Sequence, residues 1–163
     1  MKGIRRKEKE IKDRTEILRI LNRAKYVTIA MVDVDGPYLA TLTHAYDKNR
    51  NAVYFHCAKE GRKVDVLKRD SRVWGQALID LGYITGKCDH LYETAQFRGK
   101  VSFVDSPTEK RHALELLIAK NEEHPEPVIR KQVTDDSISH VNIGRIDIEF
   151  MSGKRSDKVI VSM

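Results

Sequence analysis

The feature that most constrains the fold is a succession of three β-rich runs separated by short turns. The runs cover residues 26–32, 38–43 and 52–57 and are rich in the β-branched and aromatic residues that strands favour. The turn Asp33–Gly36 ends in a glycine that is free to take a positive φ. Pro37 follows at the start of a strand, where it removes no ladder hydrogen bond. These signals predict that the chain opens as an antiparallel meander.

Helix and strand patterns continue on both sides of this meander. Residues 8–24 predict a helix, because Ile11, Leu18 and Leu21 fall on one face. Ser106, as N-cap before Pro107, predicts the start of another helix. We expect this second long helix to end near residue 120. The other expected elements are a helix over residues 63–69, strands over 73–79, 90–104 and 142–151, and a short strand in the tail 158–163. Residues 80–89 are expected to form a loop, and the pattern defines no element over the loop region 122–139.

Six or seven strands, mostly in meander order, predict a mainly β fold with flanking helices, as a closed or split antiparallel β-barrel. The chain has neither a long helix–strand alternation nor a GxGxxG or GxxxxGK[ST] loop, which argues against a doubly wound nucleotide-binding fold. A length of 163 residues is typical of one domain, which we expect to span residues 1–163.

The composition indicates the cellular compartment of the protein and the chemical class of its binding partner. The net charge of +6 suggests an anionic partner such as a nucleotide, a phosphate or a nucleic acid. A single-strand binder needs aromatic residues interleaved with basic ones along one sheet face, and aromatic residues make up only 7%, which argues against nucleic-acid binding. No apolar run is long enough to span a membrane, residues 1–14 lack the apolar centre of a signal peptide, and two cysteines are too few for a disulfide framework. We therefore expect a cytoplasmic protein.

The segment over residues 54–67 is the most informative for chemistry. A strand ends near Cys57, and Gly61, Arg62 and Lys63 then open a helix. The first turn of a helix has unpaired N–H groups and the positive end of the helix dipole, which together favour an anion. The glycine lets the backbone approach closely, arginine can bind bidentately and lysine adds a point charge. The pattern predicts a phosphate site.

A metal site is not expected from the histidines and cysteines. His56 and Cys57 are neighbours on a predicted strand and would face opposite sides of it. With Cys88 and His90 they match no zinc-binding spacing.

Several motifs, taken in order, identify a resemblance. They are Ala24–Tyr26, Asp35–Tyr38, Tyr54–Lys63, Phe97–Val101, Pro107–Arg111 and Ile146–Glu149, and the third is the most specific. From about Ile17 to Lys154 the chain resembles the pyridoxamine 5'-phosphate oxidase-like split-barrel flavoproteins, especially the nitroimidazole-resistance branch. This resemblance implies a homodimer of split barrels with FMN in a groove between the subunits, and FAD is the alternative flavin.

The resemblance also implies roles for individual residues. Arg62 and Lys63 would hold the flavin phosphate, the end of the third strand would run beside the flavin, and the second strand would present its backbone to the polar edge of the ring. Thr94, or else Gln96, would approach from a later strand of either subunit. The implied cofactor-binding residues are Ala40, Thr41, Leu42, Thr43, His56, Cys57, Ala58, Gly61, Arg62, Lys63, Thr94 and Gln96.

The implied function is an FMN-dependent oxidoreductase that acts on a small molecule, with a nitro-aromatic as candidate substrate and a nicotinamide cofactor as candidate electron donor. His56 is interpreted either as a hydrogen-bonded strand histidine or as a catalytic proton donor near the flavin. The sequence has no recognisable pyridoxal-specific motif after Ile148, which argues against pyridoxamine phosphate as substrate. Two other hypotheses stay open: a flavin carrier without turnover and, less favoured, a basic barrel that binds nucleic acid.

Overall fold

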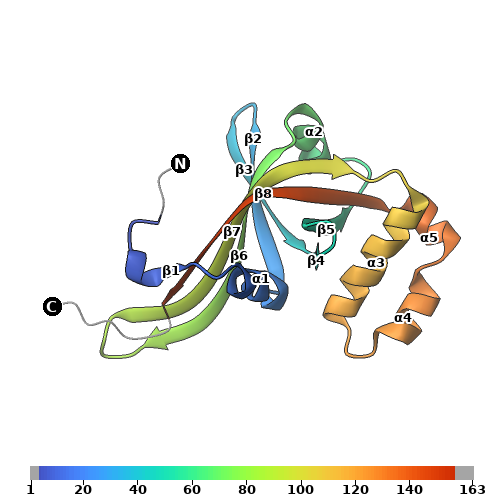
Figure 1. Cartoon of the computed structure of the whole chain (residues 1–163). Coiled ribbons are helices and arrows are strands. Elements are labelled where there is room, and N and C mark those ends of the chain that lie inside the picture. Colours follow the sequence, from blue (N-terminus) through green and yellow to red (C-terminus); the bar gives the residue numbers. More distant parts are fainter. Residues whose placement is uncertain (1–3, 157–163) are drawn as a thin grey trace.

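A strongly curved antiparallel sheet flanked by helices forms the body of the protein in the computed structural model, which describes residues 4–156 (Figure 1). The strands are β1 (Glu10–Ile11), β2 (Tyr26–Asp33), β3 (Gly36–Thr43), β4 (Ala45–Asp47), β5 (Ala52–Cys57), β6 (Arg72–Ile84), β7 (Asp89–Phe103) and β8 (Asn142–Ser156). The helices are α1 (Arg14–Arg23), α2 (Arg62–Arg69), α3 (Pro107–Asn121), α4 (Pro125–Gln132) and α5 (Asp135–His140). Among these described helices, none is long and apolar enough to cross a membrane.

The order of the strands explains how the sheet curls without closing. It runs β3-β2-β6-β7-β8-β5-β4, and β1 adds to β8. β3 and β4 lie at opposite ends of this order, although only His44 separates them in the chain. The sheet must therefore bend round on itself, and it stays open between β3 and β5. This is the split antiparallel barrel that the sequence predicted.

The interior of the barrel is filled by large side chains that face glycines on neighbouring strands. Phe55 and Phe97 are fully buried. Gly144 pairs with Phe55, and Gly75 pairs with Phe97. A Cβ atom on either glycine would lie 2.1 Å from the partner ring, so each glycine leaves the space that its partner occupies.

A second, smaller core lies on the outer side of β5, between that strand and α3. Tyr54 is fully buried there, and it packs with Ala113 and Leu117 of α3. The Tyr54 hydroxyl donates a 2.7 Å hydrogen bond to the Glu109 carboxylate. Helix α3, with α4 and α5 beside it, thus covers the side of the sheet that carries β4 and β5 (Figure 1).

The first helix is shorter than the sequence predicted. The prediction of a helix over residues 8–24 is wrong before Arg14, because Glu10 and Ile11 pair with the far end of β8 as strand β1. The Asp13 carboxylate then caps α1 by accepting a 2.8 Å hydrogen bond from the backbone N–H of Thr15. Ile11 is buried, as an apolar residue of a helix face would be, but it reaches the core from a strand.

The long hairpin of β6 and β7 also corrects a prediction. Residues 80–89 were expected to be a loop, yet β6 continues to Ile84 and β7 begins at Asp89. Gly82 lies at a register shift of the pair, and Gly86 lies in the turn with a φ of 80°. The glycines therefore mark an irregularity and a tight turn rather than a loop. The predicted strand over residues 158–163 lies outside the described residues.

Residues 122–139, which the pattern left undefined, contain most of two short helices. Pro125 occupies the first turn of α4, and Thr134 and Ser137 form a capping box at the start of α5. The predicted start of α3 is confirmed, since the Ser106 hydroxyl accepts a 3.4 Å hydrogen bond from the Glu109 N–H. β8 extends past its predicted end at residue 151 because it pairs with β7 as far as Ser156.

Candidate functional site

The start of α2 has the geometry of an anion site. Gly61 is the N-cap residue and has a φ of 122°, which a side chain would strain. Its carbonyl oxygen accepts hydrogen bonds from the N–H groups of Val64 at 2.9 Å and Asp65 at 3.1 Å. The N–H groups of Arg62 and Lys63 precede these first intrahelical bonds, so they remain available to a ligand.

Lys63 is the cation at this helix start that is free to meet an anion. Its side chain is partly buried, and its Nζ lies 5.7 Å from the centre of the Phe55 ring in β5. Among the described residues, no carboxylate forms an ion pair with it. An ammonium group that is held over an aromatic ring and lacks a counter-ion suits a phosphate.

Arg62, the other predicted phosphate ligand, is already bound by two carboxylates. Its Nε donates a 2.7 Å hydrogen bond to Asp33, and its Nη2 donates a 2.8 Å bond to Asp35. Its guanidinium also lies 4.6 Å from the centre of the Tyr38 ring. The hydrogen bond from Arg62 is the main reason why the pKa of Asp33 falls to about 2, and Arg69 also pairs with that carboxylate.

Cys57 at the end of β5 is a small, partly buried residue that packs against the core. Asn142 donates a 3.5 Å hydrogen bond to its sulfur and a 3.1 Å bond to the Ala58 carbonyl oxygen. Burial raises the pKa of the Cys57 thiol, and the charge of Lys63 opposes this rise. Cys57 is therefore a neutral packing group, and Asn142 fixes the end of the strand. Across residues 4–156, no three His, Cys, Asp or Glu side chains are placed to hold a metal ion.

His56 points to the other side of β5, where it lines a cavity of about 380 Å³ between the barrel opening and α3. The lining residues are Thr43, His56, Leu114, Leu117, Ile118, Asn121 and Glu122. The structure thus brings together Thr43 and His56, two of the predicted site residues. The α3 residues were missed, because the local sequence signals predicted only where this helix begins and ends.

β3 lies at the edge of the sheet, and this exposes its backbone. Thr41 and Thr43 point outward, whereas Ala40 and Leu42 point inward. Since β2 is the only described strand that pairs with β3, every second residue of β3 directs its N–H and C=O groups towards the barrel opening. Such a row of donors and acceptors fits the polar edge of a flavin ring, and the start of α2 fits a phosphate. The residues present therefore fit the predicted cofactor.

Thr94 and Gln96 lie away from the other predicted residues. They sit on β7, three strands from β3, which corresponds to about 14 Å at the usual strand spacing. The Thr94 hydroxyl donates a 3.2 Å hydrogen bond to the Lys154 carbonyl oxygen, and the Gln96 amide donates a 2.8 Å bond to Gln76. Within one chain, neither residue meets the backbone of β3.

The outer face of β2, β3 and β6 is unusually apolar for an exposed surface. The exposed large hydrophobic residues of the described chain all lie on these strands or in their hairpin turn: Tyr26, Val32, Val34, Leu39, Trp74, Leu78, Leu81 and Tyr83. A polar row of Thr41, Thr28, Gln76 and Gln96 crosses this face from β3 to β7. Faces of this kind typically mark an interaction site.

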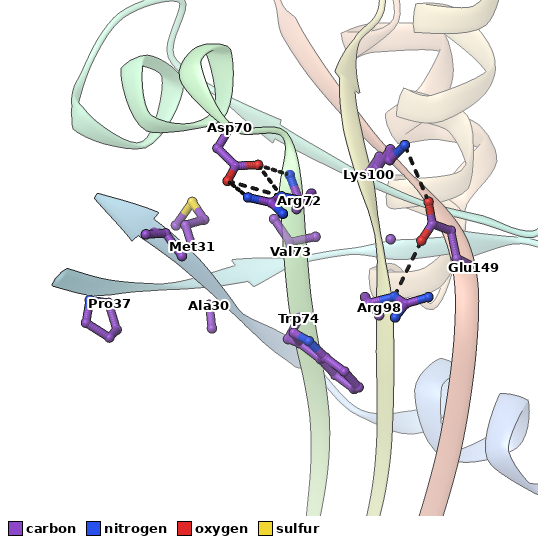
Figure 2. Close-up of a pocket in the computed structure, with 12 residues that line it drawn as sticks. Ala30, Met31, Pro37, Asp70, Arg72, Val73, Trp74, Arg98, Lys100 and Glu149 are labelled. Atoms are coloured by element: carbon purple, nitrogen blue, oxygen red, sulfur yellow. Dashed lines mark hydrogen bonds and ion pairs between the residues drawn. The ribbon is translucent and has the colours of Figure 1, made fainter. Parts of the chain in front are cut away.

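A cavity of about 510 Å³ at the end of this face nearest α2 is a weaker candidate for an anion (Figure 2). Its cationic side chains all have acidic neighbours. Asp70 binds Arg72 at 2.7 Å, and Glu149 lies 3.4 Å from Arg98 and 3.9 Å from Lys100. None of the predicted site residues lines this cavity.

A buried histidine and a partly buried lysine beside the barrel opening were also missed. His44 is fully buried between β3 and β4, and its Nε2 lies 2.8 Å from the Leu21 carbonyl oxygen. Lys120 Nζ lies 2.8 Å from the same Nε2 and donates a 2.9 Å bond to the Ala24 carbonyl oxygen. Burial lowers the pKa of His44 to about 4, with the Lys120 charge adding to the effect, and lowers the pKa of Lys120 to about 8.

Solved structures from several bacteria share this fold. A Bacteroides thetaiotaomicron protein assigned provisionally to 5-nitroimidazole antibiotic resistance is 25% identical, with a TM-score of 0.75 over 91% of this chain and 90% of that one. The flavocytochrome Anf3 of Azotobacter vinelandii is 13% identical, with a TM-score of 0.81 over 99% and 75% of the two chains. An FAD- and haem-binding protein of Mycobacterium smegmatis is 14% identical, with a TM-score of 0.78 over 95% and 77%.

The sequence itself places the chain in a family. No curated protein matches it. A family model described as pyridoxamine 5'-phosphate oxidase matches residues 13–155, which include every strand of the barrel except β1 and the last residue of β8. The chain therefore belongs to the pyridoxamine 5'-phosphate oxidase family.

Proposed function

We propose that this protein is a homodimeric FMN-binding oxidoreductase that transfers electrons to a small molecule. One observation carries the proposal: the anion site at the start of α2 contacts both strands that border the barrel opening. Arg62 lies over Tyr38 of β3, and Lys63 lies over Phe55 of β5. A helix start suited to an anion and an open backbone edge thus lie side by side, which supports binding of a flavin mononucleotide.

The roles of the binding residues follow from this arrangement. Lys63 and the N–H groups at the start of α2 would hold the phosphate, and the backbone of residues 40–43 would hydrogen-bond the polar edge of the ring. Bound FMN would supply the electron-transfer chemistry, which no side chain of the protein can perform. FAD shares this ring and first phosphate, so mass spectrometry of the released flavin separates the two cofactors.

A homodimer would complete the site. The apolar outer face of β2, β3 and β6 needs a cover, and a second copy of the chain offers the same face in return. Thr94 and Gln96 lie too far from β3 to contact a flavin there in their own subunit. Placed across a two-fold axis, these residues would reach the cofactor of the other subunit.

The cavity beside His56 would take the substrate. Leu114, Leu117 and Ile118 give it an apolar wall, which suits a small aromatic molecule. The His56 ring points into it and can carry a proton to a reduced substrate. The provisional assignment of the Bacteroides thetaiotaomicron protein supports a nitro-aromatic substrate.

An anaerobic redox titration tests the proposed activity. The flavin-loaded protein is mixed with NADH or NADPH and then with a 5-nitroimidazole, and free FMN at the same concentration is the control. We expect the yellow colour to bleach and then return faster than in the control. A flavin that is retained but never bleached would instead favour a carrier without turnover. Retention of nucleic acid but no flavin would favour the basic-barrel alternative.

A further inference from the structure

The two carboxylates on Arg62 occupy groups that a phosphate would need. A guanidinium has five N–H donors, and Arg62 directs its Nε and Nη2 donors at Asp33 and Asp35. Both acids belong to the β2–β3 hairpin, whereas Arg62 begins α2. The bonds therefore tie the hairpin to the helix at the place where the proposed phosphate binds.

The hairpin carboxylates near the start of α2 would oppose the binding of a phosphate there. Asp33 and Asp35 together neutralise Arg62 and Arg69, so at the start of α2 Lys63 is left without an ion pair to any described residue. A phosphate that carries two negative charges would be repelled by the hairpin carboxylates and attracted by the guanidinium that they hold. The phosphate and the hairpin carboxylates would therefore both bind the guanidinium of Arg62.

We propose that Asp33 and Asp35 compete with the cofactor phosphate for Arg62, so that cofactor binding loosens the attachment of the β2–β3 hairpin to α2. The inference rests on the proposed function, because it requires a phosphate at the start of α2. It adds a property that flavin binding alone does not imply: the attachment of the hairpin to α2 depends on whether the phosphate is bound.

The two acids would respond differently, and this identifies the better probe. Asp33 keeps two other partners when Arg62 turns away, namely Arg69 and the backbone N–H of Val34. Asp35 is 70% exposed, and within residues 4–156 Arg62 is its only side-chain partner. The substitution Asp35→Asn therefore removes one of the two competing carboxylates while leaving Asp33, the hairpin turn and its glycine intact.

The test compares FMN with riboflavin, which has the same ring but no phosphate. Affinities are measured by quenching of flavin fluorescence for the wild type, Asp35→Asn, Arg62→Ala and the double variant. Because exposed ion pairs contribute little, we expect Asp35→Asn to tighten FMN binding by about two- to five-fold. Riboflavin affinity should stay unchanged, and Asp35→Asn should have no effect on FMN in the Arg62→Ala background.

A matched control separates competition from a general effect of charge. Glu126 is exposed on α4, which packs against α3 outside the proposed site, so Glu126→Gln changes the net charge equally. Equal tightening by Glu126→Gln, equal tightening in the Arg62→Ala background, or no tightening by Asp35→Asn would each overturn the competition. Failure of the wild type to bind either flavin would instead overturn the proposed function, and the competition with it.

Hydrogen exchange provides a second readout on the wild-type protein. If Arg62 leaves the hairpin, the backbone amides of residues 33–36 should exchange faster with FMN bound than with riboflavin bound. Equal or slower exchange with FMN would contradict the release of the hairpin.

Discussion

Replacing Lys63 with alanine should weaken FMN binding by about 10- to 100-fold. The lysine is the second residue of α2, is partly buried, and has no carboxylate partner in the described part of the chain. A hydrogen bond to a charged group contributes about 1.5–3 kcal/mol, and each 1.4 kcal/mol corresponds to a factor of ten in affinity. The N–H groups of the helix start remain in the variant, which keeps the expected loss within this range.

Fluorescence titration with FMN and with riboflavin checks this prediction. Riboflavin affinity should change by less than about two-fold, because the proposed ring contacts involve the backbone of β3 rather than Lys63. Lys68→Ala is the matched control, since it removes the same charge from an exposed position in the last turn of α2. Unchanged FMN affinity in Lys63→Ala, or an equal loss for riboflavin, would refute the assignment of the phosphate site.

Three further predictions concern proton delivery, pH and assembly. His56→Asn should slow reoxidation of the flavin by a nitro-aromatic by about 100-fold in stopped-flow traces while leaving the flavin bound, because the imidazole would deliver the proton. Burial lowers the pKa of His44 to about 4, so the unfolded chain takes up this proton first as the pH falls. The free energy of unfolding should therefore drop by about 3 kcal/mol between pH 6.5 and 4 in urea titrations, and His44→Gln should flatten this drop. Leu39→Lys, at a position 62% exposed, should convert the proposed dimer to a monomer in light scattering.

Each of these predictions has a result that contradicts it. Normal reoxidation in His56→Asn would leave the histidine as a strand residue without a catalytic role. An equally steep loss of stability in His44→Gln would assign the acid sensitivity to other groups, and His140→Gln, at an exposed histidine of α5, is the control. A dimer that survives Leu39→Lys would place the subunit interface on another face.

Local signals in the sequence were enough to predict the elements that border the site. The turn before β3 ends in Gly36, whose φ is 127°, and the turn before α2 ends in Gly61, whose φ is 122°. Both conformations favour glycine, so the residue type itself indicated where the chain reverses or begins a helix. The start of α3 was predictable for a similar reason, because Ser106 and Pro107 form a local capping signal.

Contacts between distant segments were not predictable in this way. Arg62 meets Asp33 across 29 residues, and Lys120 meets His44 across 76. Residues 10–11 follow a helical pattern, yet pairing with β8 makes them a strand. In each case the curvature of the sheet brings the two segments together. Local sequence patterns do not predict this curvature.

Flavin binding itself is tested by the absorbance spectrum of the purified protein, repeated after incubation with excess FMN and desalting. We expect the protein to retain the flavin bands in an amount equimolar with the chain. A colourless protein that keeps no flavin after desalting would contradict the assignment of the site, while the split barrel itself would stand.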